Sequence, residues 1–295
     1  MKEAVFEILV HGETIHGIWH QPVEHVKKTA VVILHGWAGY RTGPHDMLVK
    51  TVRNLAVKGY DCFRFDFRGK GYSQGDRRKT NNRSMLDDLD AVLQHVNHVL
   101  DCPQIVLAGI CSGAKLAIYY ARSGSLPVMH VVEMSTPVLR QSDVETTLAA
   151  NHAKNNLKEY IKKAFRMETW RKLAAGELHF RAVWRNISQP VKRILKKNNK
   201  KICDKPSDQH HLRINTKTVQ EKPFGKFQGQ MLLIHGEKDP ETKPALEQIH
   251  ELLQRYRIPS DTHIVKNANH SFYSIAWEKE IIELIVNWLN KNNHR

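Results

Sequence analysis

One cysteine lies in a sequence context that would expose it as a nucleophile. A sharp turn from a strand into a helix requires small residues two positions before and two positions after its apex. Gly109 and Gly113 meet this requirement if Cys111 is the apex. Ser112 as the apex would instead place Ile110 at a crowded position. The spacing therefore predicts Cys111 as the nucleophile, at a helix N-terminus that stabilises a thiolate; the alternative is a buried structural cysteine.

Two short motifs near the C-terminus supply an acid and a base in the order expected after the nucleophile. Asp239 follows the apolar run 231–234, and His270 follows the next apolar run, 262–265. Because the carboxyl ends of parallel strands meet at one edge of a sheet, we expect both side chains to lie beside Cys111. His270 would accept the thiol proton, and Asp239 would hold the imidazole in the required tautomer.

Two backbone N–H groups are candidates for stabilising a negatively charged oxygen. The N–H of Ser112 lies one residue past the nucleophile. The second donor should come from the loop after the apolar run 30–34, which reads His-Gly-Trp-Ala-Gly at 35–39. The N–H of Trp37 is the natural candidate there. The sequence thus predicts an oxyanion hole formed by Trp37 and Ser112.

Other chemistry-bearing patterns are weaker. His11, His16 and His20 could form a metal cluster, but without a cysteine or carboxylate partner for them we expect no metal. The four cysteines contain no C-x-x-C pair, which excludes a zinc ribbon and a thioredoxin-like motif. The glycine-rich stretch 66–73 lacks the spacing of a nucleotide-binding loop and is interpreted as a structural turn. No cofactor is expected.

Short apolar runs alternate with helical patterns along the chain, which favours a mostly parallel sheet covered on both faces. The second predicted helix begins with Ser84 and Asp87 as a capping box. The predicted strands are a hairpin of 5–10 with 14–20, then 30–34, 62–66, 105–109, 128–134, 231–234 and 262–265. The predicted helices are 47–58, 84–100, 112–121, 244–256 and 273–290.

As a set, five motifs resemble the α/β-hydrolase superfamily, in its branch of monoacylglycerol-lipase-like and serine-aminopeptidase-like enzymes. The motifs are HGWAG (35–39), DFRGKGYS (66–73), GICSGA (109–114), HGEKD (235–239) and NANHSF (267–272). The resemblance implies an eight-stranded, mostly parallel sheet with a lid inserted after the sixth strand. It also implies cleavage of an ester, thioester or amide through an acyl-enzyme.

Cys111 departs from the family pattern, because most members have serine there. A cysteine nucleophile occurs in dienelactone-hydrolase-like members. The chain also resembles hydrolases that accompany bacterial exosortase and exopolysaccharide systems, on the run Phe165–Gly176 with its Trp-Arg-Lys-Leu. Cysteine at this position suits thioester substrates and acyl transfer better than amide hydrolysis.

Most of the net positive charge lies in one segment. The chain has 295 residues and a formal net charge of +15. Residues 140–225 hold 20 basic and 8 acidic residues, whereas the remainder holds 25 and 22. We therefore expect an α/β core over 1–137 and 227–295 and a basic helical lid over 138–226. The lid would cover the substrate, contact an anionic membrane or bind an acidic partner; no motif for specific nucleic-acid binding is present.

These features predict an esterase, thioesterase or acyltransferase that acts on a small ester or thioester. A substrate carried on coenzyme A or an acyl carrier protein would be anionic and would suit the basic lid. The alternative is a catalytically inactive binding protein of the same fold. No signal-peptide pattern, disulfide scaffold or apolar run of membrane-spanning length is present. A cytoplasmic protein is expected, with peripheral contact to an anionic membrane as an option for the lid.

Overall fold

The computed structural model describes residues 1–24, 26–139, 224 and 227–292. The chain divides into two compact units, one formed by Met1–Leu139 with Thr218–Arg295 and the other by Arg140–Lys217. All of the described residues belong to the first unit, and the second unit lies outside them. The basic lid predicted over 138–226, and the run Phe165–Gly176 within it, therefore stay predictions.

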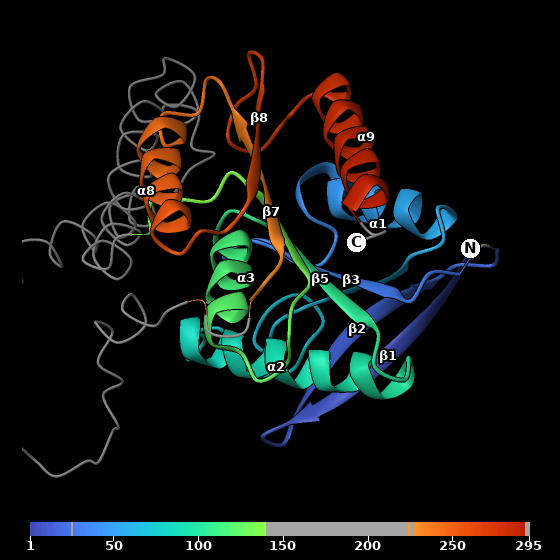
Figure 1. Cartoon of the computed structure of the whole chain (residues 1–295). Helices are drawn as coiled ribbons and strands as arrows, with labels where there is room; N and C mark the ends of the chain where they lie inside the picture. Colours follow the sequence, from blue (N-terminus) through green and yellow to red (C-terminus); the bar gives the residue numbers. More distant parts are fainter. Residues whose placement is uncertain (25, 140–223, 225–226, 293–295) are drawn as a thin grey trace, which may run out of the picture. The chain divides into compact units, whose positions relative to one another are not determined.

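A single sheet of eight strands runs through the first unit (Figure 1). Its spatial order is β1-β2-β4-β3-β5-β6-β7-β8. β2 is antiparallel to both of its neighbours, and all other neighbouring strands are parallel, which confirms the predicted mostly parallel sheet. The strands are β1 (Lys2–Val10), β2 (Glu13–Gln21), β3 (Thr29–Leu34), β4 (Asp61–Phe65), β5 (Gln104–Ile110), β6 (His130–Met134), β7 (Gln230–Gly236) and β8 (Ser260–Val265).

Helices cover both faces of the sheet, as expected for parallel strands (Figure 1). α1 (Met47–Val57) and α9 (Ile275–Asn292) pack on one face. α2 (Asn82–Val99), α3 (Ser112–Ser123) and α8 (Thr242–Arg255) pack on the other. A short 3-10 helix, Pro44–Asp46, precedes α1. None of the described helices is long and apolar enough to cross a membrane.

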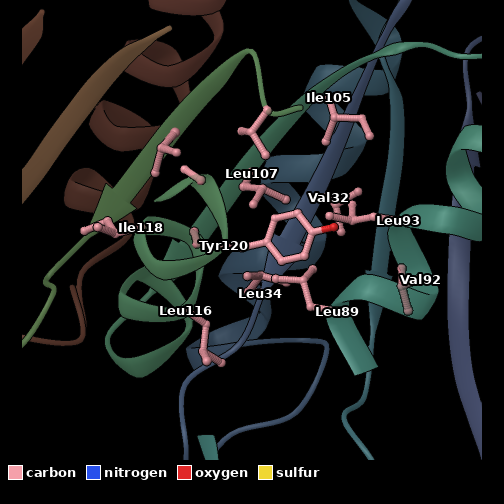
Figure 2. Close-up of a cluster of buried hydrophobic side chains, with 14 of the residues drawn as sticks. Val32, Leu34, Leu89, Val92, Leu93, Ile105, Leu107, Leu116, Ile118 and Tyr120 are labelled. Carbon is pink, nitrogen blue, oxygen red and sulfur yellow. The ribbon is translucent and has the colours of Figure 1, made fainter. Parts of the chain in front are cut away.

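The core beneath α2 and α3 shows why the strand sequences are so apolar. Every residue of β3 is buried, because helices cover it on both sides. Figure 2 shows Tyr120 of α3 among side chains of β3, β5 and α2, including Val32, Leu107 and Leu93. This packing holds β3 and β5, whose carboxyl ends lead into residues 35–39 and into Cys111.

The predicted elements are confirmed to within three residues at each end, but the predicted cap of α2 was wrong. Asn81 is the N-cap, and its side chain accepts hydrogen bonds from the N–H groups of Arg83 and Ser84 at 3.0 and 3.1 Å. The Ser84 hydroxyl accepts from Asn81 N at 3.0 Å. Ser84 therefore completes the capping box as its third residue, and Asp87 takes no part. Asparagine is among the strongest N-cap residues, which explains the earlier start.

Candidate active site

Cys111 occupies a sharp turn between β5 and α3, here called the Cys111 turn (residues 109–113). Its backbone angles are φ 56° and ψ −123°, which few residues other than glycine adopt. A Cβ atom at Gly109 would lie 2.5 Å from the carbonyl carbon of Gly113. A Cβ atom at Gly113 would lie 2.5 Å from the carbonyl oxygen of Leu34. Both glycines are thus required by close backbone contacts, as the motif predicted. Cys111 N also donates to Met134 O at 2.8 Å, which ties the turn to β6.

His270 lies in the loop after β8, next to Asp239 in the turn after β7. His270 Nδ1 donates to Asp239 Oδ2 at 2.7 Å, and the other carboxylate oxygen of Asp239 accepts from Glu241 N at 3.0 Å. The Asp239 side chain is buried, whereas that of His270 is 36% exposed. Because Nδ1 is bound to Asp239, the remaining ring nitrogen of His270 is available to the nucleophile.

The electrostatics of these residues favour an imidazolium ring between the Asp239 carboxylate and the Cys111 sulfur. Hydrogen bonds to Asp239 and then to the Cys111 side chain raise the pKa of His270 to about 10, against the opposing effect of burial. Burial would raise the pKa of Asp239, but the hydrogen bonds from His270 and from Glu241 N outweigh it and lower that pKa. The structure therefore brings Cys111, His270 and Asp239 together at the carboxyl edge of the sheet.

The loop after β3, residues 35–39, lies against the Cys111 turn and is here called the oxyanion loop. A Cβ atom at Gly36 would lie 3.4 Å from Cys111 Cβ. Trp37 N donates to Ser112 Oγ at 2.5 Å. The N–H of Ser112 belongs to the first turn of α3, where N–H groups have no partner within the helix. Both predicted donors are therefore at the turn, and a substrate oxygen would compete with the Ser112 hydroxyl for the N–H of Trp37.

Two buried lysines near the Cys111 turn were missed by the sequence analysis. Lys70, in the 66–73 turn, donates from Nζ to Trp37 O at 2.6 Å. Lys115, in the first turn of α3, is buried and interacts electrostatically with Cys111. Burial lowers the pKa of each of these lysines to about 8. For Lys115, the available signal was a charged residue inside an otherwise apolar helix pattern.

Two of the three histidines considered for a metal cluster each lie beside a different glutamate of β1. His16 Nδ1 lies 3.1 Å from Glu7 Oε1, and His20 Nδ1 lies 3.3 Å from Glu3 Oε1. Within the part of the chain that the structure describes, no group of three or more His, Cys, Asp or Glu side chains could hold a metal ion.

A family model described as the alpha/beta hydrolase fold matches residues 29–275, a range that contains Cys111, Asp239, His270 and the two candidate oxyanion donors. The chain belongs to the α/β-hydrolase fold family. Within this α/β hydrolase, the matched range runs from β3 to the start of α9, so the hairpin of β1 and β2 lies outside it. No curated protein sequence matches the chain.

Several solved structures resemble this α/β hydrolase over nearly its whole length. An esterase of Pyrococcus furiosus is 18% identical, with 99% of this chain and 91% of the esterase covered and a TM-score of 0.63. Est1E from Butyrivibrio proteoclasticus, solved with ferulic acid bound, is 16% identical, with coverage of 98% and 100% and a TM-score of 0.63. A serine hydrolase homologue from Coxiella burnetii is 17% identical, with coverage of 98% of both chains and a TM-score of 0.58. At these identities the likeness shows the shared fold.

Proposed function

We propose that this α/β hydrolase cleaves an ester or thioester bond of a small acyl substrate through a covalent thioester on Cys111. One observation carries the proposal. The ring of His270 is bound through Nδ1 to buried Asp239, and its pKa is raised by Asp239 and then by the Cys111 side chain. This is the arrangement of an activated nucleophile, its base and the residue that orients the base.

Each step of the proposed reaction uses a group in this arrangement. The His270 imidazolium holds the proton that the Cys111 thiol gives up, and the thiolate sulfur attacks the substrate carbonyl carbon. The carbonyl oxygen becomes an oxyanion that accepts hydrogen bonds from the N–H groups of Trp37 and Ser112. The intermediate collapses, and the leaving group takes the proton from His270. Water or another acceptor, deprotonated by His270, then attacks the thioester and restores the Cys111 thiol.

A cysteine nucleophile bears on the class of substrate. Attack by a thiolate exchanges one thioester for another at little cost in free energy, so thioesters and activated esters suit Cys111 better than amides. A substrate carried on coenzyme A or an acyl carrier protein is anionic and matches the 20 basic against 8 acidic residues of 140–225.

Cys62, Cys102 and Cys111 are all free, which fits a reducing compartment such as the cytoplasm.

Intact-mass spectrometry tests the proposal directly. The protein is incubated with a panel of acyl-coenzyme A thioesters and p-nitrophenyl esters, and both the protein mass and the released product are measured. We expect an acyl adduct or product in the wild type and neither in Cys111→Ala. Cys102→Ala is the matched control, because Cys102 is also a free thiol but is exposed and outside the Cys111 turn.

The remaining outcomes separate the alternatives. Turnover that persists in Cys111→Ala would exclude Cys111 as the nucleophile. Product that appears only when an alcohol or amine acceptor is added would identify an acyltransferase. Neither adduct nor turnover across the panel would favour a catalytically inactive binding protein.

A further inference from the structure

Lys70 connects two loops that follow neighbouring parallel strands. It lies in the 66–73 turn after β4, whereas Trp37 lies in the oxyanion loop after β3. Lys70 Nζ donates to Trp37 O at 2.6 Å and lies 4.3 Å from the centroid of the Trp37 ring. One ammonium group thus contacts both the backbone and the aromatic face of the residue whose N–H is a candidate oxyanion donor.

The turn that carries Lys70 is itself firmly held. Lys70 N donates to Phe67 O and Ser73 N donates to Lys70 O, each at 3.0 Å. The Ser73 hydroxyl donates to Asp66 O at 2.6 Å, and the buried Asp66 carboxylate accepts from Tyr72 N at 3.0 Å. The backbone on both sides of Lys70 is therefore fixed, and its side chain extends from a rigid support.

The buried ammonium group of Lys70 requires nearby groups that stabilise its charge. The side chain is buried, and burial followed by the nearby charge of Arg77 lowers the pKa of Lys70 to about 8. At pH 7 the amine is still mostly protonated. Among the described residues, Lys70 forms no ion pair with a carboxylate. A buried charge without a counter-ion costs free energy. The carbonyl and the ring of Trp37 are the groups that offset this cost.

The backbone of Trp37 is held on both sides. The carbonyl before it, Gly36 O, accepts from His35 Nδ1 at 2.8 Å and from Gly39 N at 3.0 Å. The carbonyl after it, Trp37 O, accepts from Lys70. The Trp37 N–H lies in the first of these peptide planes and Lys70 holds the second, so the two sets of bonds together fix the backbone angles of Trp37. Without Lys70, only one of the two planes would be held, and Trp37 would turn more freely about the bonds that join them.

We propose that Lys70 is a positioning residue for acylation, which holds Trp37 so that its N–H points at the developing oxyanion. This inference rests on the proposed function, because the Trp37 N–H has a catalytic role only if a substrate carbonyl binds at Cys111. A poorly aligned donor weakens binding of the transition state more than binding of the substrate. Loss of Lys70 should therefore lower kcat and leave KM nearly unchanged.

The test compares Lys70→Met and Lys70→Arg with Lys79→Met, a control that removes an exposed lysine from the same region. Amide hydrogen exchange of residues 35–39 is measured together with steady-state kinetics on an ester that acylates Cys111. In Lys70→Met we expect exchange at Trp37 to quicken at least about tenfold. We expect kcat to fall about 10- to 100-fold, less than for outright loss of an oxyanion donor. Arginine can donate to the same carbonyl, so Lys70→Arg should restore most of both properties, and Lys79→Met should match the wild type.

Two results would overturn the inference. One is unchanged amide hydrogen exchange at Trp37 in Lys70→Met. This result would overturn the inference even if the wild type shows no turnover. The other is faster exchange with an unchanged kcat. Failure of the proposed function has a different signature, namely a wild type that forms neither adduct nor product at Cys111. If Lys70→Met does not fold, Lys70→Gln, whose side chain is too short to reach the Trp37 carbonyl, carries the same two expectations.

Discussion

At the scale of single residues, the site depends on contacts that run from Asp239 to His270 and from His270 toward Cys111. Asp239 is buried and accepts hydrogen bonds from both His270 Nδ1 and Glu241 N. Its negative charge is therefore held directly beside the His270 ring. His270 is more exposed than Asp239, which leaves its other ring nitrogen open to the thiol and to a substrate. The Asp239 carboxylate is thus fixed by burial and by its two hydrogen bonds, and it orients the His270 ring.

Replacing Asp239 by asparagine should lower the pKa of His270. The hydrogen bond to Asp239 is the largest cause of the rise to about 10, and asparagine can accept the same bond without a negative charge. We expect the pKa of His270 to fall toward its ordinary value of 6.5. Titration of ¹⁵N-labelled histidine by NMR measures it, with Glu247→Gln as the control for loss of an exposed carboxylate.

The raised pKa of His270 also makes the free energy of unfolding depend on pH in a defined direction. A raised pKa in the folded state means that the charged His270 contributes to the free energy of unfolding below pH 6.5 and that this contribution disappears as the pH rises through about 10. The free energy of unfolding should therefore differ less between pH 6.5 and pH 10 in Asp239→Asn than in the wild type. A His270 pKa that stays near 10 in Asp239→Asn would contradict the assigned cause.

At the scale of elements, the site is formed where β3, β5 and α3 meet. Gly113 lies in the first turn of α3 and packs against the end of β3. An added Cβ atom there would lie 2.5 Å from Leu34 O and 2.6 Å from His35 O, both backbone atoms that cannot move alone. The position of α3 directly after Cys111 therefore depends on a residue without a side chain.

Gly113→Ala should displace α3 from β3, with a loss of stability of about 2 kcal/mol or more and loss of acylation at Cys111. Gly39→Ala is the matched control for stability, because its added Cβ atom would meet its nearest neighbour at 3.6 Å, an ordinary contact. Urea unfolding and the rate of acyl-adduct formation measure the two effects. Equal stability of the two variants would show that the Cys111 turn tolerates a side chain at Gly113.

Much of this arrangement could be predicted from the sequence, because it depends on local patterns. Apolar runs indicated the strands, and the two glycines around Cys111 indicated the turn, because close backbone contacts leave no other residue type there. Asp239 and His270 could be paired because the ends of parallel strands share one edge. Each of these predictions uses only spacing along the chain and one rule of sheet geometry.

The contacts that could not be predicted join positions whose pairing has no local signal. The bond from Lys70 to Trp37 O spans two loops, and the glycine-rich stretch 66–73 reads equally well as a turn with no further contact. The bond from Trp37 N to Ser112 Oγ depends on a side-chain rotamer that spacing does not reveal. The N-cap of α2 was missed because Asn81 precedes the apolar pattern that defines the helix.

At the scale of the whole described unit, several polar residues are buried as neutral groups. Burial, followed by the charge of Arg64, lowers the pKa of His20 to about 4. Burial likewise lowers the pKa of His35 to about 4, where the ring hydrogen-bonds Gly36 O of the oxyanion loop. Both side chains are fully buried, one on β2 and one at the end of β3. The fold therefore holds two imidazole rings that are neutral in mildly acidic solution.

Stability should consequently decrease as the pH falls from 6.5 to 4. In this range the unfolded chain binds protons at His20 and His35 that the folded chain does not, so protonation favours unfolding. Each ring accounts for about 3 kcal/mol over the full range. His20→Gln keeps an acceptor for Arg64 Nε, which donates to His20 Nε2 at 2.9 Å, and removes the titrating ring. The free energy of unfolding, measured in urea between pH 7 and pH 4, should change less steeply in His20→Gln than in the wild type. Replacement of the exposed His98 by glutamine should leave the slope unchanged, and an identical slope in all three proteins would show that His20 is not a source of the acid sensitivity.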